Sequence, residues 1–139
     1  MQHYISIEKN RNGGFEYFKT LWAERGITGI MATTMTEGIE KATEIENSKN
    51  DELYFIDIVA DEFANYMAEL RILSEETNAP ILIVTSNYST EEHRQATLNG
   101  ASFYGGYCEP AENNIDAVIN IVNNQWGRLQ EVLGGVKFP

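Results

Sequence analysis

Cysteine and long hydrophobic runs are scarce in this sequence. Cys108 is its only cysteine, which excludes an internal disulfide and is typical of a reducing compartment. No apolar run approaches the roughly 20 residues that a membrane-spanning helix needs, and residues 1–10 lack the positive and apolar regions of a signal peptide. We therefore expect a cytoplasmic protein that does not enter a membrane.

Basic residues are few as well. The sequence has 10 Lys and Arg against 21 Asp and Glu, a formal net charge of -11 at pH 7. A surplus of negative charge repels the phosphate groups of nucleic acids and of anionic membranes. The sequence therefore predicts no nucleic-acid binding and no membrane binding, and it favours proteins or cations as partners.

The remaining composition is typical of a globular domain. Hydrophobic residues make up 42% of the 139 residues and charged residues 22%, so the chain can bury a core without disulfides or metals. Internal repeats and low-complexity segments are missing from the sequence. We expect one domain over residues 1–139.

Short apolar runs alternate with segments of helical spacing along the chain. The expected strands are residues 4–7, 27–32, 53–57, 81–84 and 101–107. The expected helices are residues 15–25, 35–45, 61–77, 89–99 and 113–133, with Thr34 or Thr36 capping the second and Asp61 the third. Five strands alternating with five helices predict an α/β fold, a doubly wound parallel sheet with helices on both faces.

Polar residues stand at the ends of four of these strands. They are Glu8-Lys9, Asp57, Thr85-Ser86 and Glu109-Pro110. Because parallel strands bring their carboxyl ends to one edge of the sheet, where α/β proteins bind ligands, we expect these residues to lie near one another. Taken alone, Asp57 is more simply explained as a residue that turns the chain or caps the next helix.

The order and spacing of these polar residues resemble the receiver domain of bacterial response regulators, over nearly the whole chain. That family has an acidic pair after strand one, a phosphoryl-accepting Asp after strand three, Thr or Ser after strand four and Lys-Pro after strand five. The resemblance implies the flavodoxin-like fold, a role in two-component signalling and a histidine kinase or another signalling protein as partner.

The resemblance also implies roles for individual residues. Asp57 would be the phosphoacceptor, and Glu8 with the backbone carbonyl of Val59 would help Asp57 to hold Mg²⁺, which offsets the charge of the incoming oxygens. The Thr85 hydroxyl would move to the phosphoryl group. An aromatic side chain of the fifth strand, Tyr104 or Tyr107, would turn inward with it.

Three positions depart from the family pattern. Lys9 replaces the second acid, Glu109 replaces the Lys before proline, and Asp61 stands where many relatives have proline. An anion in place of a cation about 4 Å from a phosphoryl group changes the pair energy by several kcal/mol at an effective dielectric near 20. We expect impaired or absent Mg²⁺-dependent phosphorylation, and an ion pair of Lys9 with Asp57, Glu109 or both.

Three functions agree with these observations. The first is an atypical receiver domain, a non-enzymatic interaction module that forms homodimers through helix four, strand five and helix five, the last of which would lead to an output domain. The second is a conventional phospho-switch that accepts phosphate from a histidine kinase. The third is a small flavodoxin-like enzyme or cofactor binder, which is disfavoured because Asn12-Gly13-Gly14 is not followed by the Lys-Ser/Thr of a phosphate-binding loop.

Overall fold

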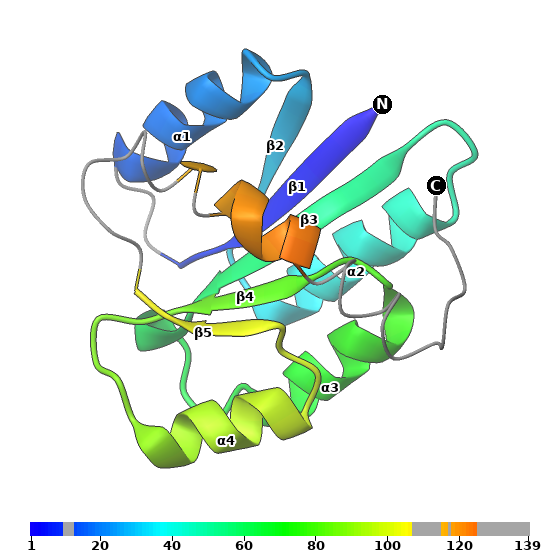
Figure 1. The fold of residues 1–139 in the computed structure, drawn as a ribbon. Helices are drawn as coiled ribbons and strands as arrows, with labels where there is room; N and C mark the ends of the chain where they lie inside the picture. Colours follow the sequence, from blue (N-terminus) through cyan, green and yellow to red (C-terminus); the bar gives the residue numbers. More distant parts are fainter. Residues whose placement is uncertain (10–12, 107–114, 117, 125–139) are drawn as a thin grey trace. The chain divides into compact units, whose positions relative to one another are not determined.

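The computed structural model describes residues 1–9, 13–106, 115, 116 and 118–124 (Figure 1). The chain divides into two compact units, Met1–Gly106 and Tyr107–Pro139. In the second unit the described residues 115, 116 and 118–124 are helical. They fall within the helix predicted at residues 113–133, whose remaining residues lie outside the described part of the chain.

The first unit contains a five-stranded parallel sheet in the order β2-β1-β3-β4-β5. The strands are β1 (Gln2–Ile7), β2 (Ile27–Ala32), β3 (Glu52–Val59), β4 (Ile81–Val84) and β5 (Phe103–Gly105). The predicted doubly wound parallel sheet is confirmed, with β2 and β4 at the predicted residues. The fifth strand is shorter than the predicted 101–107 within the described residues, because β5 lies at an edge and only three of its residues pair with β4.

Helices connect the strands, as predicted. They are α1 (Gly13–Ala23), α2 (Met35–Glu46), α3 (Met67–Glu76) and α4 (Thr90–Leu98), with a short 3-10 helix, η1 (Ala60–Glu62), directly after β3. Thr34 is the cap of α2, because its hydroxyl accepts the Glu37 amide at 3.0 Å. After α4, Gly100 has φ +106°, a left-handed conformation that favours glycine and ends the helix.

The main core lies between the sheet and the helices α2, α3 and α4. Alternate residues of the central strands point to this side, since successive strand residues face opposite sides of a sheet. It includes Ile5, Ile7, Ile56, Ile58, Ile81 and Ile83 from the strands, with Leu70 and Leu73 from α3 and Ala96 from α4. These six isoleucines bury one face of the sheet against the helices.

A cluster of aromatic rings occupies the opposite side of the sheet, which α1 covers. Tyr4 of β1 stacks on Phe55 of β3 with ring centroids 5.0 Å apart, and Trp22 of α1 lies 5.1 Å from Phe55. Tyr4, Phe55 and Trp22 are all buried. The aromatic spacing that predicts the first helix therefore also explains how that helix packs.

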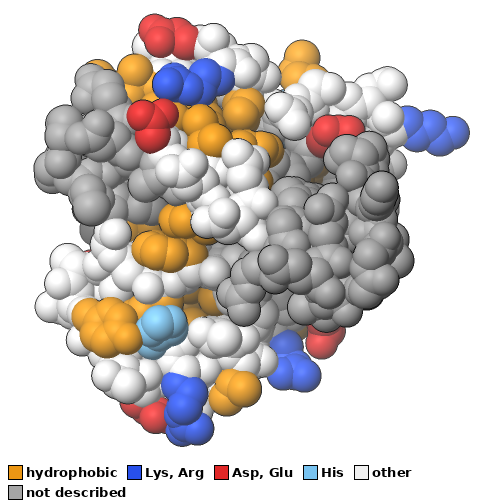
Figure 2. All heavy atoms as spheres, viewed as in Figure 1, with side chains coloured by type: hydrophobic (Ala, Val, Ile, Leu, Met, Phe, Trp, Pro, Cys, Tyr) orange, Lys and Arg blue, Asp and Glu red, His pale blue; other side chains and the backbone are white. Residues whose placement is uncertain are grey.

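The described surface is mixed in charge. On the face drawn in Figure 2, the described basic side chains are scattered and do not gather into one patch. In the ranges that the structure describes, no helix combines the length and apolar character needed to cross a bilayer.

Candidate functional site

Asp57 lies inside β3, two residues before its end. It pairs with Ser6 of β1 on one side and Leu82 of β4 on the other, and Ile58 and Val59 continue the strand. The prediction that the strand ends at this carboxylate was therefore wrong. Both neighbouring strands supply backbone hydrogen bonds past Asp57, so the ladder does not stop where the apolar run stops.

The Asp57 carboxylate shares a hydrogen-bond donor with Glu8. The Ser6 hydroxyl is 2.6 Å from Asp57 Oδ1 and 3.2 Å from Glu8 Oε2. A hydroxyl has one hydrogen to donate, so it serves chiefly the nearer Asp57 oxygen. Ser6 did not emerge from the sequence as a site residue, although a lone polar residue in the run Tyr4 to Ile7 is a signal that could have indicated it.

Burial strongly affects both carboxyl groups. It raises the pKa of Asp57 to about 7; the negative charge of Glu8 adds to this, while the Ser6 hydrogen bond opposes it. Burial likewise raises the pKa of Glu8, with Ser6 again opposing and Glu62 adding. The pair therefore binds a proton more readily than free carboxyl groups do.

Glu8 is buried and offers one oxygen without a partner. Its side chain is 8% exposed, and Oε1 accepts no hydrogen bond from the described residues. A buried carboxylate oxygen of this kind is satisfied by a proton or a cation. Glu8 and Asp57 thus fit the first two ligands of a Mg²⁺ ion, which often keeps several waters and takes one or two carboxylates. Among the residues that the structure describes, no group of three or more His, Cys, Asp or Glu could hold a metal.

Val59, the third predicted metal ligand, is the last residue of β3. It pairs with Val84 of β4 and immediately precedes η1. Val59 therefore lies two residues beyond Asp57 on the same strand. The role predicted for its backbone carbonyl remains a prediction.

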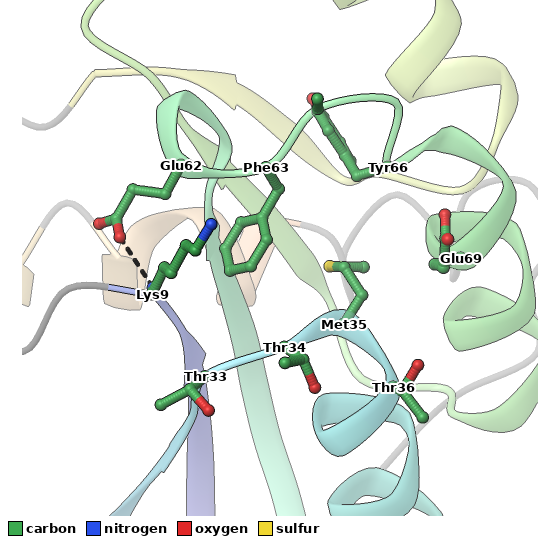
Figure 3. A pocket seen from close by; sticks show the side chains of 10 residues that line it. Lys9, Thr33, Thr34, Met35, Thr36, Glu62, Phe63, Tyr66 and Glu69 are labelled. Atoms are coloured by element: carbon green, nitrogen blue, oxygen red, sulfur yellow. Dashed lines mark hydrogen bonds between the residues drawn. The ribbon is translucent and has the colours of Figure 1, made fainter.

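Lys9 does not form the expected ion pair with Asp57. No ion pair within 4.0 Å joins these two described residues, and the Lys9 backbone amide instead donates to Glu62 Oε2 at 2.8 Å. Its side chain is exposed and reaches toward Phe63 (Figure 3). The reason is that the chain leaves β1 toward the turn after β3, which carries Glu62. The alternative partner, Glu109, lies outside the described residues.

Lys9 lines a pocket of about 300 Å³ beside this turn (Figure 3). The other lining residues come from the start of α2, from η1 and from the residues around the start of α3. They are Thr33, Thr34, Met35, Thr36, Glu62, Phe63, Ala64, Tyr66 and Glu69. The lining thus combines three threonines, two carboxylates and one ammonium group with the apolar side chains of Met35, Phe63 and Ala64.

Asp61 does not cap a helix, contrary to the prediction. Helix α3 begins only at Met67, because Phe63 is extended and Asn65 has φ +53°, a conformation that Asn tolerates better than most residues. The Asp61 carboxylate instead contacts the residues after β4. Thr85 Oγ1 donates to Oδ1 at 2.7 Å, and Ser86 donates to Oδ2 through its amide at 2.9 Å and its hydroxyl at 2.6 Å.

Tyr104 of β5 is buried, with 5% of its surface exposed. Its hydroxyl donates to Glu92 Oε2 of α4 at 2.7 Å and accepts the Ser89 amide at 3.3 Å. The ring stacks on His93 with centroids 5.1 Å apart and meets Tyr88 edge-on at 5.5 Å. Of the two candidate aromatic residues, Tyr104 therefore lies turned into the protein, whereas Tyr107 is outside the described residues.

Comparisons with known proteins identify the fold. No protein-family profile matches the chain, and no curated protein matches it. Among solved structures, a two-component response regulator from Clostridium difficile is 19% identical, with 90% of this chain and 98% of that chain covered and a TM-score of 0.68. The BeF3-activated N-terminal receiver domain of Klebsiella pneumoniae RstA is 15% identical, with 86% and 97% covered and a TM-score of 0.64.

A third similar structure is a response regulator protein from Burkholderia pseudomallei with a phosphorylated aspartic acid, a calcium ion and citrate. It is 20% identical, with 94% of this chain and 75% of that chain covered and a TM-score of 0.65. At these identities the likeness concerns the fold. The chain has the fold of response regulator receiver domains, as the order of its polar residues predicted.

Proposed function

We propose that this chain is an atypical receiver domain, a non-enzymatic signalling module whose Asp57 is poorly phosphorylated. Mg²⁺ binds it weakly, and it works chiefly by binding other signalling proteins. The receiver fold supports the signalling role, and the departures at Lys9 and Glu109 support the loss of efficient phosphoryl transfer.

The observation that carries the proposal is the pairing of Asp57 with Glu8 through Ser6. A phosphoacceptor must be an ionised nucleophile beside a cation that neutralises the incoming oxygens. Here burial raises the pKa of both carboxyl groups, that of Asp57 to about 7, so a proton competes with the metal at Asp57 near neutral pH. Lys9, in the position of the second acid, supplies no further carboxylate ligand.

Phosphorylation is tested by intact-mass analysis after incubation with acetyl phosphate and Mg²⁺. We expect little of the protein to gain a phosphoryl group. Asp57→Asn serves as the control that identifies the acceptor, because Asn is similar in size and cannot form the acyl phosphate. Rapid, stoichiometric modification that disappears in Asp57→Asn would establish a conventional phospho-switch and refute the proposal.

The partner is proposed to be a second signalling protein or another copy of the chain. Helix α4, which carries exposed residues and few apolar ones, and strand β5 supply the described part of the proposed dimer surface. Sedimentation velocity over a range of protein concentrations measures the association. A monomer at high concentration, with and without Mg²⁺ and beryllofluoride, would exclude this surface as a dimer site.

A further inference from the structure

The Asp61 carboxylate makes a bridge between the turn after β3 and the segment after β4. We define the Asp61 bridge as its hydrogen bonds with Thr85 Oγ1, Ser86 N and Ser86 Oγ. These residues are 24 and 25 positions away in the chain, so the bridge is a tertiary contact. Hydrogen bonds to a charged group are stronger than those between neutral groups, although exposure of Asp61 to solvent weakens them.

Asp61 is suited to be the anion of this bridge. The Ser86 hydroxyl, and after it the Ser86 amide and the Thr85 hydroxyl, hold the Asp61 pKa below its ordinary value, while partial burial acts in the opposite direction. Asp61 is therefore ionised at neutral pH. Its two oxygens receive three donors from one short segment. Asp61 Oδ1, at 2.7 Å, is the nearer acceptor for the Thr85 hydroxyl, and the Asn87 carbonyl oxygen lies at 3.2 Å.

A series of contacts leads from the bridge into α4. The Thr85 hydroxyl accepts the Asn87 amide at 3.0 Å, which shapes the loop before α4. The Ser89 amide, two residues further on, donates to the Tyr104 hydroxyl at 3.3 Å. Tyr104 in turn is hydrogen-bonded to Glu92 of α4.

Asp57 makes no hydrogen bond to Thr85 within the described part of the chain. Its carboxylate bonds to Ser6, on β1, whereas Thr85 donates to Asp61. The orientation of Thr85 is thus set from η1 and does not require any group attached to Asp57.

We infer that Asp61 is a positioning residue that holds the segment Thr85 to Ser89 in place and keeps Tyr104 buried against α4 without any modification of Asp57. In its contacts with Thr85 and Ser86, the Asp61 carboxylate supplies an anion from within the chain. The α4 surface is therefore set in one state by the sequence itself. This inference rests on the proposed function, because it names how a receiver-type domain presents one α4 surface when phosphorylation is inefficient.

The test compares Asp61→Ala with Glu62→Ala, the neighbouring carboxylate on the same 3-10 helix, which bonds to the Lys9 amide instead. Nuclear magnetic resonance measures amide hydrogen exchange at Asn87 and Ser89 and contacts between the rings of Tyr104 and His93. In Asp61→Ala we expect exchange to accelerate about tenfold or more, as the loss of one charged hydrogen bond implies, and the ring contacts to weaken. In Glu62→Ala both should stay within about twofold of the wild type.

Two further variants separate positioning from general stability. Asp61→Asn keeps an acceptor for Thr85 and loses the negative charge, so its effect should be intermediate. Thr85→Val removes the hydroxyl that donates to Asp61 and accepts the Asn87 amide, and combining it with Asp61→Ala should free the Tyr104 ring no further than either change alone.

The charge-preserving variant Asp61→Glu gives a readout that a merely structural role would not alter, because it keeps a carboxylate at this position. Its Asn87 and Ser89 exchange and its Tyr104 ring signals should lie closer to those of the wild type than those of Asp61→Ala do. If Asp61→Ala leaves the Tyr104 contacts and the Asn87 and Ser89 exchange as in the wild type, the inference is wrong. Phosphorylation of wild-type Asp57, measured by mass, would instead refute the proposed function, so the two failures are distinguishable.

Discussion

The raised pKa of Asp57 predicts that the folded protein loses stability as the pH rises through neutrality. Its pKa is about 7 in the folded chain against an ordinary value of 3.8. Between these values the folded state holds a proton that the unfolded state has released, so the free energy of unfolding falls with rising pH. The contribution is fully present below about pH 4 and is lost as the pH passes through 7.

The size of this effect can be worked out for a practical pH range. Each pKa unit corresponds to about 1.4 kcal/mol, and between pH 5 and pH 8 the folded carboxyl group goes from protonated to ionised while the unfolded one is ionised throughout. The expected loss is about 2–3 kcal/mol. Because the Asp57 side chain is only half-buried, we take about 2 kcal/mol as the working value.

Urea unfolding at pH 5, 6, 7 and 8 measures this loss in the wild type and in Asp57→Asn. Asn keeps an acceptor for the Ser6 hydroxyl but does not titrate, so the variant should lose about 2 kcal/mol less over the range. Glu8→Gln removes the neighbouring charge that raises the Asp57 pKa, so its decline should begin at lower pH. Parallel curves for the wild type and Asp57→Asn, within about 0.5 kcal/mol, would refute the reasoning.

Two further predictions concern helix α2. Thr34→Ala removes the cap and should lower the free energy of unfolding by about 1 kcal/mol in a thermal or chemical melt. The control Thr36→Ala, at an exposed position two residues further on, should change it by less than about 0.5 kcal/mol. Equal effects of the two changes would contradict the capping role of Thr34. Gly38→Ala should destabilise the fold by about 1–3 kcal/mol, because the new Cβ would meet Ile7 Cδ1 of β1. The added Ile7→Val change removes that methyl group and should recover part of the loss, and a purely additive pair would show that the contact is not the cause.

The strands and helices of the sheet fold could be predicted from the spacing of apolar residues, because this spacing determines which side chains are buried. The runs Ile27 to Ala32 and Ile81 to Val84 became strands at the predicted residues, since an apolar stretch of that length has to be covered on both sides. The sequence left two candidates for the cap of α2, Thr34 and Thr36. The hydrogen bond from the Glu37 amide to the Thr34 hydroxyl decides between them.

The site was less predictable, because tertiary contacts determine it. Because Asp61 precedes a segment of helical spacing, the sequence predicts it as a helix cap. Its hydrogen-bond partners, Thr85 and Ser86, instead follow strand β4. Asn65 adopts φ +53°, which Asn tolerates better than most residues, and helix α3 begins only after it. The charges of Lys9 and Asp57 suggested an ion pair, yet the direction in which the chain leaves β1 takes the Lys9 side chain elsewhere. For Thr85 and Glu8, the resemblance predicted the positions but not the hydrogen-bond partners that the structure gives them.

The aromatic cluster of Tyr4, Phe55 and Trp22 provides a fluorescent reporter for the acid pair Glu8 and Asp57. Along the strands, Tyr4 is two residues from Ser6, and Phe55 is two residues from Asp57. Burial raises the pKa of Tyr4, and the negative charge of Asp57 raises it further. The electric field of the carboxylate therefore extends into the ring cluster. Trp22 lies 5.8 Å from Tyr4. With Trp126→Phe removing the second tryptophan of the sequence, we expect the emission of Trp22 to follow the titration of Asp57 in solution without any label.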